Sequence, residues 1–261
     1  MPMVLLAQLS DTHFNMGARN NERAERVMAF LAELPQRPDA ILVTGDIADE
    51  GDIEEYQQAR AALIADVPVL ILPGNHDDRG NLRSVFFPDT SGYGPINQSH
   101  TVDGVTLALL DSSIPGKPEG LFDEETYTFL TDLLAAAPAD ESIIVAMHHP
   151  PRPVQSTVCD PIRLTNPERL AEIMAGDDRI IAVLTGHVHA GVMTQFAGKP
   201  LIVAPSVSST IGLEWERAAP GHVPIDFAPD PSLVFHSIQD GELLSTFRPI
   251  AMGGWLSEPD D

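Results

Sequence analysis

The sequence predicts an α/β fold, in which helices cover a sheet, because two residue patterns alternate along the chain. Short apolar runs that end in small or polar residues are typical of buried strands. The stretches between them carry apolar residues at helical spacing, which indicates helices with one face on the core. The chain has 261 residues, 43% of them hydrophobic and 20% charged, which is enough material for one large domain with a substantial core.

The first half of the chain follows the order strand, helix, strand, helix, strand. The apolar faces of its two helices include Leu31 and Leu63, which lie at helical spacing from other apolar residues. We predict strands at residues 4–9, 40–43, 67–72 and 105–110, and helices at 21–34 and 52–64.

The second half contains two further helices and a series of strands. We predict helices at 123–137 and 167–175, strands at 142–147 and 179–184, and a pair of strands near 191–197 and 200–204. Gly198 suits the turn between that pair, and Asp240-Gly241 suits the turn of a last hairpin at 232–239 and 242–249. The proline-rich stretch 214–231 is predicted to be a loop or an oligomer contact, and the residues after 251 are expected to be loose.

The chain is strongly acidic, with 15 basic and 38 acidic residues and a formal net charge of −23. A nucleic-acid polymer is not expected as a partner, because polymer binding depends on Lys and Arg side chains that neutralise phosphates. No membrane partner is expected either, since no apolar run approaches the ~20 residues that cross a bilayer. The first residues lack a basic segment, and the single cysteine, Cys159, allows no disulfide within the chain. Both features suit the cytoplasm.

Residues of the kinds that bind metals directly follow five of the predicted strands. Parallel strands joined by right-handed crossovers place their carboxyl ends at one edge of a sheet. The spacings of 35 residues from Asp11 to Asp46 and 29 residues from Asp46 to Asn75 each suit one βαβ unit. We therefore expect the five motifs to meet in one crevice. In chain order they are Asp11-Thr12-His13, Gly45-Asp46, Gly74-Asn75-His76-Asp77, His148-His149 and Gly186-His187-Val188-His189.

The residue types in these motifs predict two metal ions rather than one. Two aspartates, one asparagine and four histidines offer mixed oxygen and nitrogen ligation, which is typical of Mn, Fe, Zn or Co and too rich in nitrogen for Ca or Mg. Seven ligands exceed what one tetrahedral ion needs, but they suit two ions that share a carboxylate. The predicted ligands are Asp11, His13, Asp46, Asn75, His148, His187 and His189.

In type and order, the five motifs resemble those of the calcineurin-like metallophosphoesterase superfamily: D-x-H, G-D, G-N-H-[DE], a lone His and G-H-x-H. The resemblance implies a four-layer α/β/β/α sandwich of two mixed sheets flanked by helices. It also implies that His76 is the catalytic imidazole beside the leaving group. Asp77 is the expected partner that orients His76, with a helix N-cap as its alternative role. The resemblance assigns Asp11, His13, Asp46 and His189 to a first metal, and Asp46, Asn75, His148 and His187 to a second.

Within the superfamily, the chain is most similar to the bacterial group of class III cyclic nucleotide phosphodiesterases and glycerophosphodiester phosphodiesterases. The finer match lies in residues 9–14, 72–78, 110–113 and 147–151, and it fades after Ala204. It implies one domain over residues 1–261, with a core at 1–205 and a variable substrate or oligomer region at 206–261. It further implies a homo-oligomer, a dimer or larger.

The predicted function is hydrolysis of small phosphodiesters, with cyclic nucleotides such as 3′,5′-cAMP as the first candidates. Two alternatives stay open: a glycerophosphodiester or broad-specificity phosphodiesterase or phosphatase, and a metal-binding scaffold without turnover. Glu50 stands where the superfamily's protein Ser/Thr phosphatases carry an arginine that holds a phosphate dianion. This difference argues against phosphoprotein substrates.

Other polar residues are expected to lie outside the metal set. His149 follows a predicted ligand directly, and neighbours at a strand end point to opposite sides, so we expect it behind the site or in the core. Arg79 is expected to be an exposed salt-bridge partner, with contact to a substrate anion as its alternative role. Cys159 is expected to be a packed thiol. The isolated histidines His100, His222 and His236 are expected to be surface or core residues.

Overall fold

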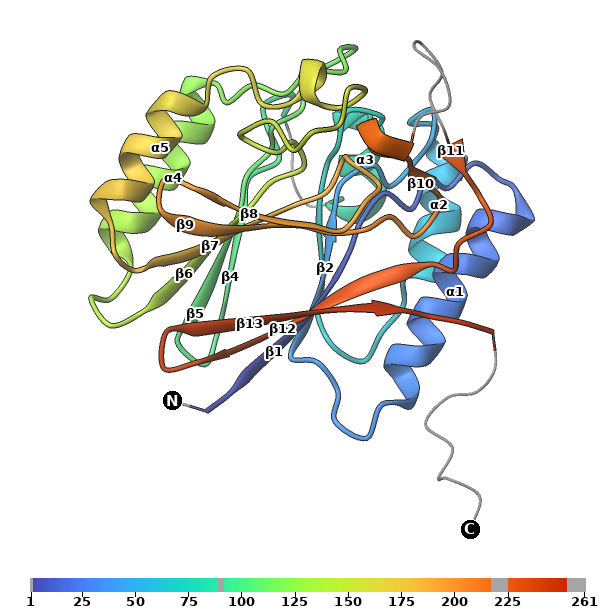
Figure 1. The fold of residues 1–261 in the computed structure, drawn as a ribbon, viewed down its shortest axis with the longest axis horizontal. Coiled ribbons are helices and arrows are strands. Elements are labelled where there is room, and N and C mark those ends of the chain that lie inside the picture. The colour runs from blue at the N-terminus through green and yellow to red at the C-terminus, as the bar shows by residue number, and fades with distance from the viewer. Residues whose placement is uncertain (1, 89–91, 217–224, 253–261) are drawn as a thin grey trace.

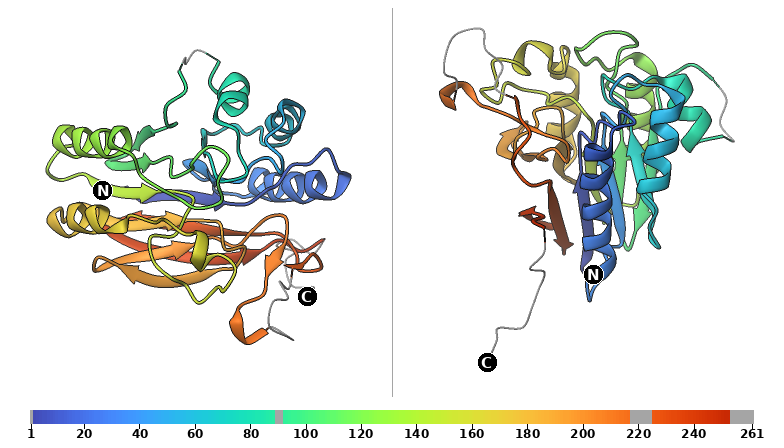
Figure 2. Two further views of the ribbon diagram at one scale, coloured as in Figure 1. Left: turned by 90° about the horizontal axis from the view of Figure 1, so that it is seen from above. Right: turned by 90° about the vertical axis from the view of Figure 1, so that its right-hand side faces the viewer.

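Two large mixed sheets lie face to face, and helices cover the outer face of each (Figure 1; Figure 2). The computed structural model describes residues 2–88, 92–216 and 225–252. The four-layer α/β/β/α sandwich that the motifs implied is therefore confirmed. Within the described residues, no helix combines the length and the apolar character that a membrane span requires.

The first sheet has three parallel strands in the middle and at one edge, and an antiparallel hairpin at the other. In chain order, this sheet and its helices consist of β1 (Val4–Leu9), α1 (Ala18–Glu33), β2 (Ala40–Thr44), α2 (Ile53–Ala62), β3 (Val69–Leu72), α3 (Arg79–Phe86), β12 (Ser232–Gln239) and β13 (Glu242–Pro249). The strand order is β13-β12-β1-β2-β3. β1, β2 and β3 run parallel, as the predicted alternation requires, and β12 pairs antiparallel with β1.

The second sheet has six strands in the order β4-β5-β6-β7-β9-β8. Its elements are β4 (Gln98–Val102), β5 (Val105–Leu109), α4 (Glu124–Ala136), β6 (Ser142–Ala146), α5 (Pro167–Gly176), β7 (Ile180–Thr185), β8 (Val192–Phe196) and β9 (Lys199–Val203). Two short strands, β10 (Thr210–Ile211) and β11 (Ile225–Asp226), pair separately, and single 3₁₀ turns cover Asp160–Ile162 and Glu214–Glu216. Figure 1 shows α4 and α5 on one side of the stacked sheets and α1, α2 and α3 on the other.

The short strands β10 and β11 and the two 3₁₀ turns were not predicted, and β11 lies within the stretch 214–231 that was predicted to be a loop. One longer helix and one strand of the second sheet were not predicted either. α3 contains Gly80 and Asn81, which are weak helix formers, and it begins with the Asp78 carboxylate accepting a hydrogen bond from Asn81 N at 2.8 Å. β4 is an edge strand with a single aliphatic residue, Val102, so it lacks the apolar run of a buried strand. Part of the proline-rich stretch, the tail after 252 and His222 lie outside the described residues.

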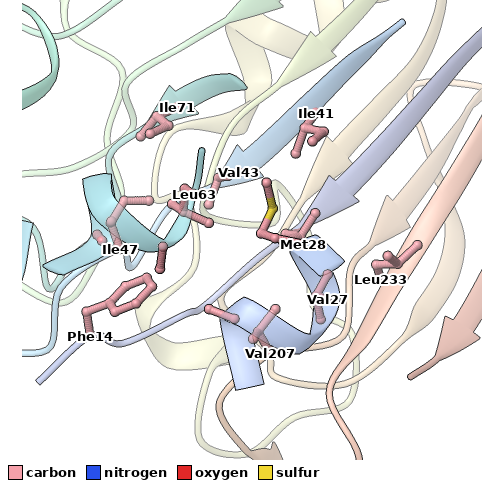
Figure 3. Close-up of a cluster of buried hydrophobic side chains, with 14 of the residues drawn as sticks. Phe14, Val27, Met28, Ile41, Val43, Ile47, Leu63, Ile71, Val207 and Leu233 are labelled. Atoms are coloured by element: carbon pink, nitrogen blue, oxygen red, sulfur yellow. The ribbon is translucent and has the colours of Figure 1, made fainter. Parts of the chain in front are cut away.

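Alternating side chains along the strands supply the cores between the layers. In β1, Leu6 points into the core between the two sheets, whereas Ala7 and Leu9 face the helices. Figure 3 shows the helix-facing core, where Val27 and Met28 of α1 lie beside side chains of β2. Each fully buried aliphatic side chain of this kind contributes roughly 1.5–3 kcal/mol to stability.

The C-terminal hairpin belongs to these cores. The predicted strands of the hairpin match β12 and β13 at both ends, and Asp240 and Gly241 make the turn. Leu233 packs in the helix-facing core, while Val234 and Ile238 pack between the sheets. Residues after 205 therefore also contribute to the core.

A buried histidine joins the hairpin to the layer between the sheets. His236 Nε2 lies 2.9 Å from Gln8 Oε1, and His236 Nδ1 lies 2.8 Å from Ser245 Oγ. Gln8 Nε2 in turn donates to the Thr185 carbonyl of the second sheet and to Thr44 Oγ1, both at 3.0 Å. Burial lowers the pKa of His236 to about 3, so the ring is neutral in the folded protein at neutral pH.

Replacing His236 by Gln is expected to weaken the acid sensitivity of the fold. Between pH 6.5 and about 3 the unfolded chain binds a proton at His236 that the folded chain does not. The free energy of unfolding therefore falls by about 1.4 kcal/mol for each pH unit of acidification, from this residue alone. Urea unfolding of chelator-treated protein at pH 6, 5 and 4 should give a correspondingly shallower slope for His236→Gln. Equal slopes would contradict this role of His236.

Candidate metal centre

Backbone hydrogen bonds connect the loops that follow the carboxyl ends of four strands. After β1 and β2, Asp11 N donates to the Gly45 carbonyl at 3.1 Å and His13 N donates to the Asp46 carbonyl at 3.0 Å. After β6 and β7, Gly186 N donates to the His148 carbonyl at 3.0 Å. The expected crevice is therefore present, built from both sheets.

One side chain joins these two sets of loops. The Asp11 carboxylate accepts a hydrogen bond from His187 N, at 3.1 Å for each oxygen. Asp11 follows β1 of the first sheet, whereas His187 follows β7 of the second. The positions of the predicted ligands on the two sheets are thus fixed relative to each other.

Five of the seven predicted ligands adopt left-handed backbone conformations. A residue with a Cβ atom is uncommon in this region, and strain of this kind concentrates at functional sites. The five positive φ angles are 53° for Asp11, 45° for His13, 50° for Asp46, 71° for His187 and 55° for His189.

Glycines make room for the carboxylates of the site. A Cβ atom on Gly74 would overlap the side chain and the backbone nitrogen of Asp46. A Cβ atom on Gly186 would overlap Ser10 Oγ and lie 2.9 Å from Asp11 Oδ2. Both glycines therefore serve close approach, as expected for loops that bring backbone and ligand side chains together.

The first predicted donor set lies close together and is buried. His13 Nε2 lies 3.6 Å from Asp46 Oδ2, and His189 Nε2 lies 3.5 Å from Asp11 Oδ1. The two ring nitrogens, His13 Nε2 and His189 Nε2, are 3.1 Å apart. One ligand atom from each of these four residues lies within 4.8 Å of the others, which is a spacing that one metal ion can bridge.

The second donor set shares Asp46 with the first. His148 Nε2 lies 3.3 Å from Asp46 Oδ2, the same oxygen that faces His13. His148 Nε2 also lies 3.2 Å from Asn75 Oδ1 and 3.3 Å from His187 Nδ1. Asp46 is therefore placed to bridge two ions.

The far nitrogens of two histidines fix the orientation of the near ones. His13 Nδ1 lies 3.0 Å from Asp49 Oδ1, and His148 Nδ1 lies 2.7 Å from the Thr44 carbonyl. Because a carboxylate and a carbonyl can only accept, each Nδ1 carries a hydrogen, so that each ring in its neutral form presents an Nε2 lone pair to the site. Lone pairs and carboxylate oxygens that converge without hydrogens between them suit a cation, so the residues present fit a pair of metal ions.

The electrostatic environment also suits metal ligands. Burial raises the pKa of Asp46, but the nearby His148 and His13 rings outweigh this effect. The pKa of the Asp46 carboxyl therefore lies well below its usual range. Burial lowers the pKa of His187 strongly and that of His189 to about 4, which keeps both rings neutral at pH 7. Burial also lowers the pKa of His148, but Asp46 outweighs it and raises the value to about 9. A metal at this site therefore competes with a proton for His148.

His76 lies beside the donor sets, with its ring exposed. Its backbone N donates to Asp46 Oδ1 at 2.9 Å, and its ring makes an edge contact with His13 at a centroid distance of 4.7 Å. His76 Nδ1 donates to the Asp49 carbonyl at 2.7 Å, which leaves Nε2 as the other polar atom of the ring. Asp49 thus contacts both His13 and His76. This role was not identified from the sequence, although Asp49 lies in the same loop as Asp46.

A cleft of about 680 Å³ opens in front of His76. Residues from four loops and from the start of α3 form its walls. They are Asp49, Glu50, Asn75, His76, Asp77, Asp78, Arg79, Gly80, Tyr93, Pro115 and Gly116. The cleft is large enough for a small organic phosphate ester.

A family model described as calcineurin-like phosphoesterase matches residues 4–191, which include every predicted ligand. The chain belongs to the calcineurin-like phosphoesterases. Enzymes of this family use a binuclear metal centre, so the expectation of a metal-dependent hydrolase with two metal ions is confirmed.

Proteins similar to this phosphoesterase carry two kinds of name. The cAMP/cGMP dual specificity phosphodiesterase of Mycobacterium tuberculosis is 32% identical, with 99% of this chain and 89% of that protein covered. A glycerophosphodiester phosphodiesterase of Enterobacter lignolyticus is also 32% identical, with 97% and 94% covered. Among solved structures, a dimetal phosphatase of Danio rerio has the same fold, with a TM-score of 0.63, 17% identity and 93% and 98% of the two chains covered.

Asp77 does not orient His76, so this prediction is wrong. Its buried carboxylate instead accepts hydrogen bonds from the backbone nitrogens of Ile47, Ala48 and Gly74, and from Tyr56 Oη at 3.0 Å. The alternative role as a helix N-cap is wrong too, since Asp78 caps α3. Burial and then the nearby Asp46 charge raise the pKa of Asp77, against the effect of its backbone donors. Asp77 ties the two loops that carry Asp46 and Asn75.

His149 lies behind the phosphoesterase site, as expected. Its ring packs against that of His187 at a centroid distance of 4.7 Å. Both of its nitrogens have partners, however: Nδ1 lies 2.8 Å from Ser112 Oγ, and Nε2 lies 3.2 Å from the Pro118 carbonyl. Burial, followed by the charge of His148, lowers the pKa of His149 to about 3. His149 is therefore a neutral support for the loop rather than a free ligand.

Replacing Asp46 by Ala is expected to remove bound metal, because one oxygen of Asp46 faces both donor sets. Elemental analysis of Mn²⁺-loaded protein should fall from two ions per chain to one or fewer. An Asp66→Asn control removes a carboxylate that is 91% exposed and far from the site, and should retain two. Two tightly bound ions in Asp46→Ala would contradict a shared carboxylate.

Replacing Asp77 by Asn is expected to lower stability and to leave metal content intact. The amide would turn its NH₂ group toward backbone donors and leave at least one of them unpaired, at about 1–3 kcal/mol. Urea unfolding measures this loss, and elemental analysis measures the metals. Unchanged stability together with a large loss of kcat would restore a catalytic role for Asp77.

Proposed function

We propose that this phosphoesterase hydrolyses small phosphodiesters with two metal ions, and that cyclic nucleotides such as 3′,5′-cAMP are its first candidate substrates. One observation carries the proposal: a single oxygen of Asp46 faces both donor sets, and His76 stands beside it at the cleft. The complete ligand set and the presence of His76 argue against a scaffold without turnover.

The seven ligands have separate roles in this proposal. Asp11, His13, Asp46 and His189 would hold the first ion, and Asp46, Asn75, His148 and His187 the second. When bound, the ions supply positive charge for the phosphate oxygens and lower the pKa of a water molecule that attacks phosphorus.

His76 would handle the proton of the leaving group. Hydrolysis breaks the bond between phosphorus and the leaving oxygen, which then needs a proton. In the protonated ring, Nδ1–H stays bound to the Asp49 carbonyl, and Nε2–H can transfer its proton to that oxygen. The ring is left neutral, still held by Nδ1–H. Asp49 therefore sets the direction in which His76 can act.

The alternative substrate class is glycerophosphodiesters. The Mycobacterium relative is named for cyclic nucleotides and the Enterobacter relative for glycerophosphodiesters, and both are 32% identical to this chain. The donor sets treat both substrate classes alike, since each presents a phosphodiester. Residues of the cleft wall rather than the ligands must select between them.

The cellular compartment and the oligomeric state of the enzyme are also part of the proposal. We place it in the cytoplasm, where Cys159, buried and without a second cysteine in the chain, stays reduced. We also propose a dimer or a larger assembly. Exposed apolar residues on two edge strands support this, with Met193 on β8 and Leu244 on β13 both more than half exposed.

Purified Mn²⁺-loaded protein is expected to hydrolyse diesters faster than monoesters. The test compares initial rates for bis(p-nitrophenyl) phosphate, p-nitrophenyl phosphate, 3′,5′-cAMP, 2′,3′-cAMP and a glycerophosphodiester. In His76→Ala the diester rate should fall by about 10²–10⁴, because the leaving group loses its proton donor.

The metal content of His76→Ala serves as the control, since His76 is not a ligand and two ions should remain. The best natural diester then names the substrate class. No turnover of any ester by protein that holds two ions per chain would overturn the catalytic proposal.

A further inference from the structure

The cleft in front of His76 has a strongly acidic wall. Among its lining residues, Asp49, Glu50 and Asp78 carry carboxylates at the surface, whereas Arg79 is the one cation. Asp49 and Asp78 are engaged, the first with His13 and the second with Asn81 N. Glu50 is exposed, and its carboxylate accepts no hydrogen bond from the described part of the chain.

Arg79 cannot offset this charge, because a buried carboxylate already pairs with it. Arg79 Nε lies 2.7 Å from Asp111 Oδ2, and Arg79 Nη2 donates to the Ser113 carbonyl at 2.8 Å. The expected salt bridge is thus present, but both of its side chains are largely buried. No unpaired cation among the lining residues is left to receive a second anionic group.

The backbone holds Glu50 next to the catalytic imidazole. The peptide unit between Asp49 and Glu50 is fixed at both ends: its carbonyl accepts from His76 Nδ1 at 2.7 Å, and its N–H donates to Glu55 Oε2 at 3.0 Å. Glu55 is itself buried and closes the capping box of α2. The Glu50 side chain therefore starts one residue from the contact that orients His76, on the wall of the same cleft.

We propose that Glu50 selects against substrates that carry a second negative charge on the phosphate, and so favours diesters over monoesters. The inference rests on the proposed phosphodiesterase function. A diester has one charge, whereas a monoester is a dianion above its second pKa of ~6. The oxygen that leaves is an ester oxygen in both substrates. The monoester carries a charged oxygen where the diester keeps its second ester oxygen, and Glu50 at the cleft would repel this added charge.

The same repulsion acts on the product. Hydrolysis of a diester by water breaks one phosphorus–oxygen ester bond and yields an alcohol and a monoester, which is again a dianion. Glu50 therefore favours product release as well as substrate selection. This role also accounts for an acidic residue where related protein phosphatases carry an arginine.

The test compares wild-type protein with the variants Glu50→Gln and Glu50→Lys. Glu54→Gln is the control, because Glu54 is also an exposed carboxylate of this stretch but does not line the cleft. At pH 8, kcat/KM is measured for p-nitrophenyl phosphate and bis(p-nitrophenyl) phosphate. The monoester-to-diester ratio should rise by about three- to tenfold in Glu50→Gln, and further in Glu50→Lys, for one charge in a partly screened site. Glu54→Gln should leave the ratio unchanged.

Calorimetric binding of inorganic phosphate to the Mn²⁺-loaded proteins gives a second measure that needs no turnover. Both Glu50 variants should bind phosphate about three- to tenfold more tightly than wild type. Ratios and phosphate affinities within twofold of wild type in both variants would overturn the role of Glu50. Absence of diester turnover in the wild type would instead overturn the proposed function, and phosphate binding would still decide on Glu50.

Discussion

The rest of the site depends on one buried carboxylate, that of Asp46. It is 2% exposed, and a buried charge of this kind costs several kcal/mol unless it is paired. The structure surrounds it with compensating groups: His13 and His148 approach one oxygen, and His76 N donates to the other. Gly74 is needed because any Cβ atom there would fill the space that the carboxylate occupies. The surrounding loops are therefore arranged around a negative charge that two cations would share.

The stacking of the sheets makes this arrangement possible. Asp11 and Asp46 come from the first sheet, whereas His148 and His187 come from the second, so neither sheet alone contains a complete donor set. Below the site, Gln8 spans the same gap and bonds to Thr185 of the opposite sheet. Polar contacts in such a layer fix the relative position of the sheets more narrowly than apolar packing does, because hydrogen bonds demand a particular distance and direction.

The sequence was most informative where local patterns coincide with global structure. β1, β12 and β13 have the predicted ends, and the predicted ligands of each sheet meet because its parallel strands share an edge. The roles of Asp77 and Asp49 could not be predicted in the same way. Adjacency in sequence suggested that Asp77 orients His76, but the chain turns there and directs the Asp77 carboxylate to backbone donors of its own motif and of the loop after Asp46. The atom that does hold His76 is a backbone carbonyl, which no residue type reveals.

The acidity of the chain bears directly on which phosphate esters can approach the site. A protein with a formal net charge of −23 repels anions at long range, and the wall of its cleft does so at short range. Bound ions would supply positive charge where the donor sets converge, and the side chain that stands beside Asp46 at the cleft is a histidine, His76. A substrate with a single charged phosphate and an uncharged remainder loses least in approaching such a surface. Polyanions such as nucleic acids lose most, which agrees with the proposal that small diesters are the substrates.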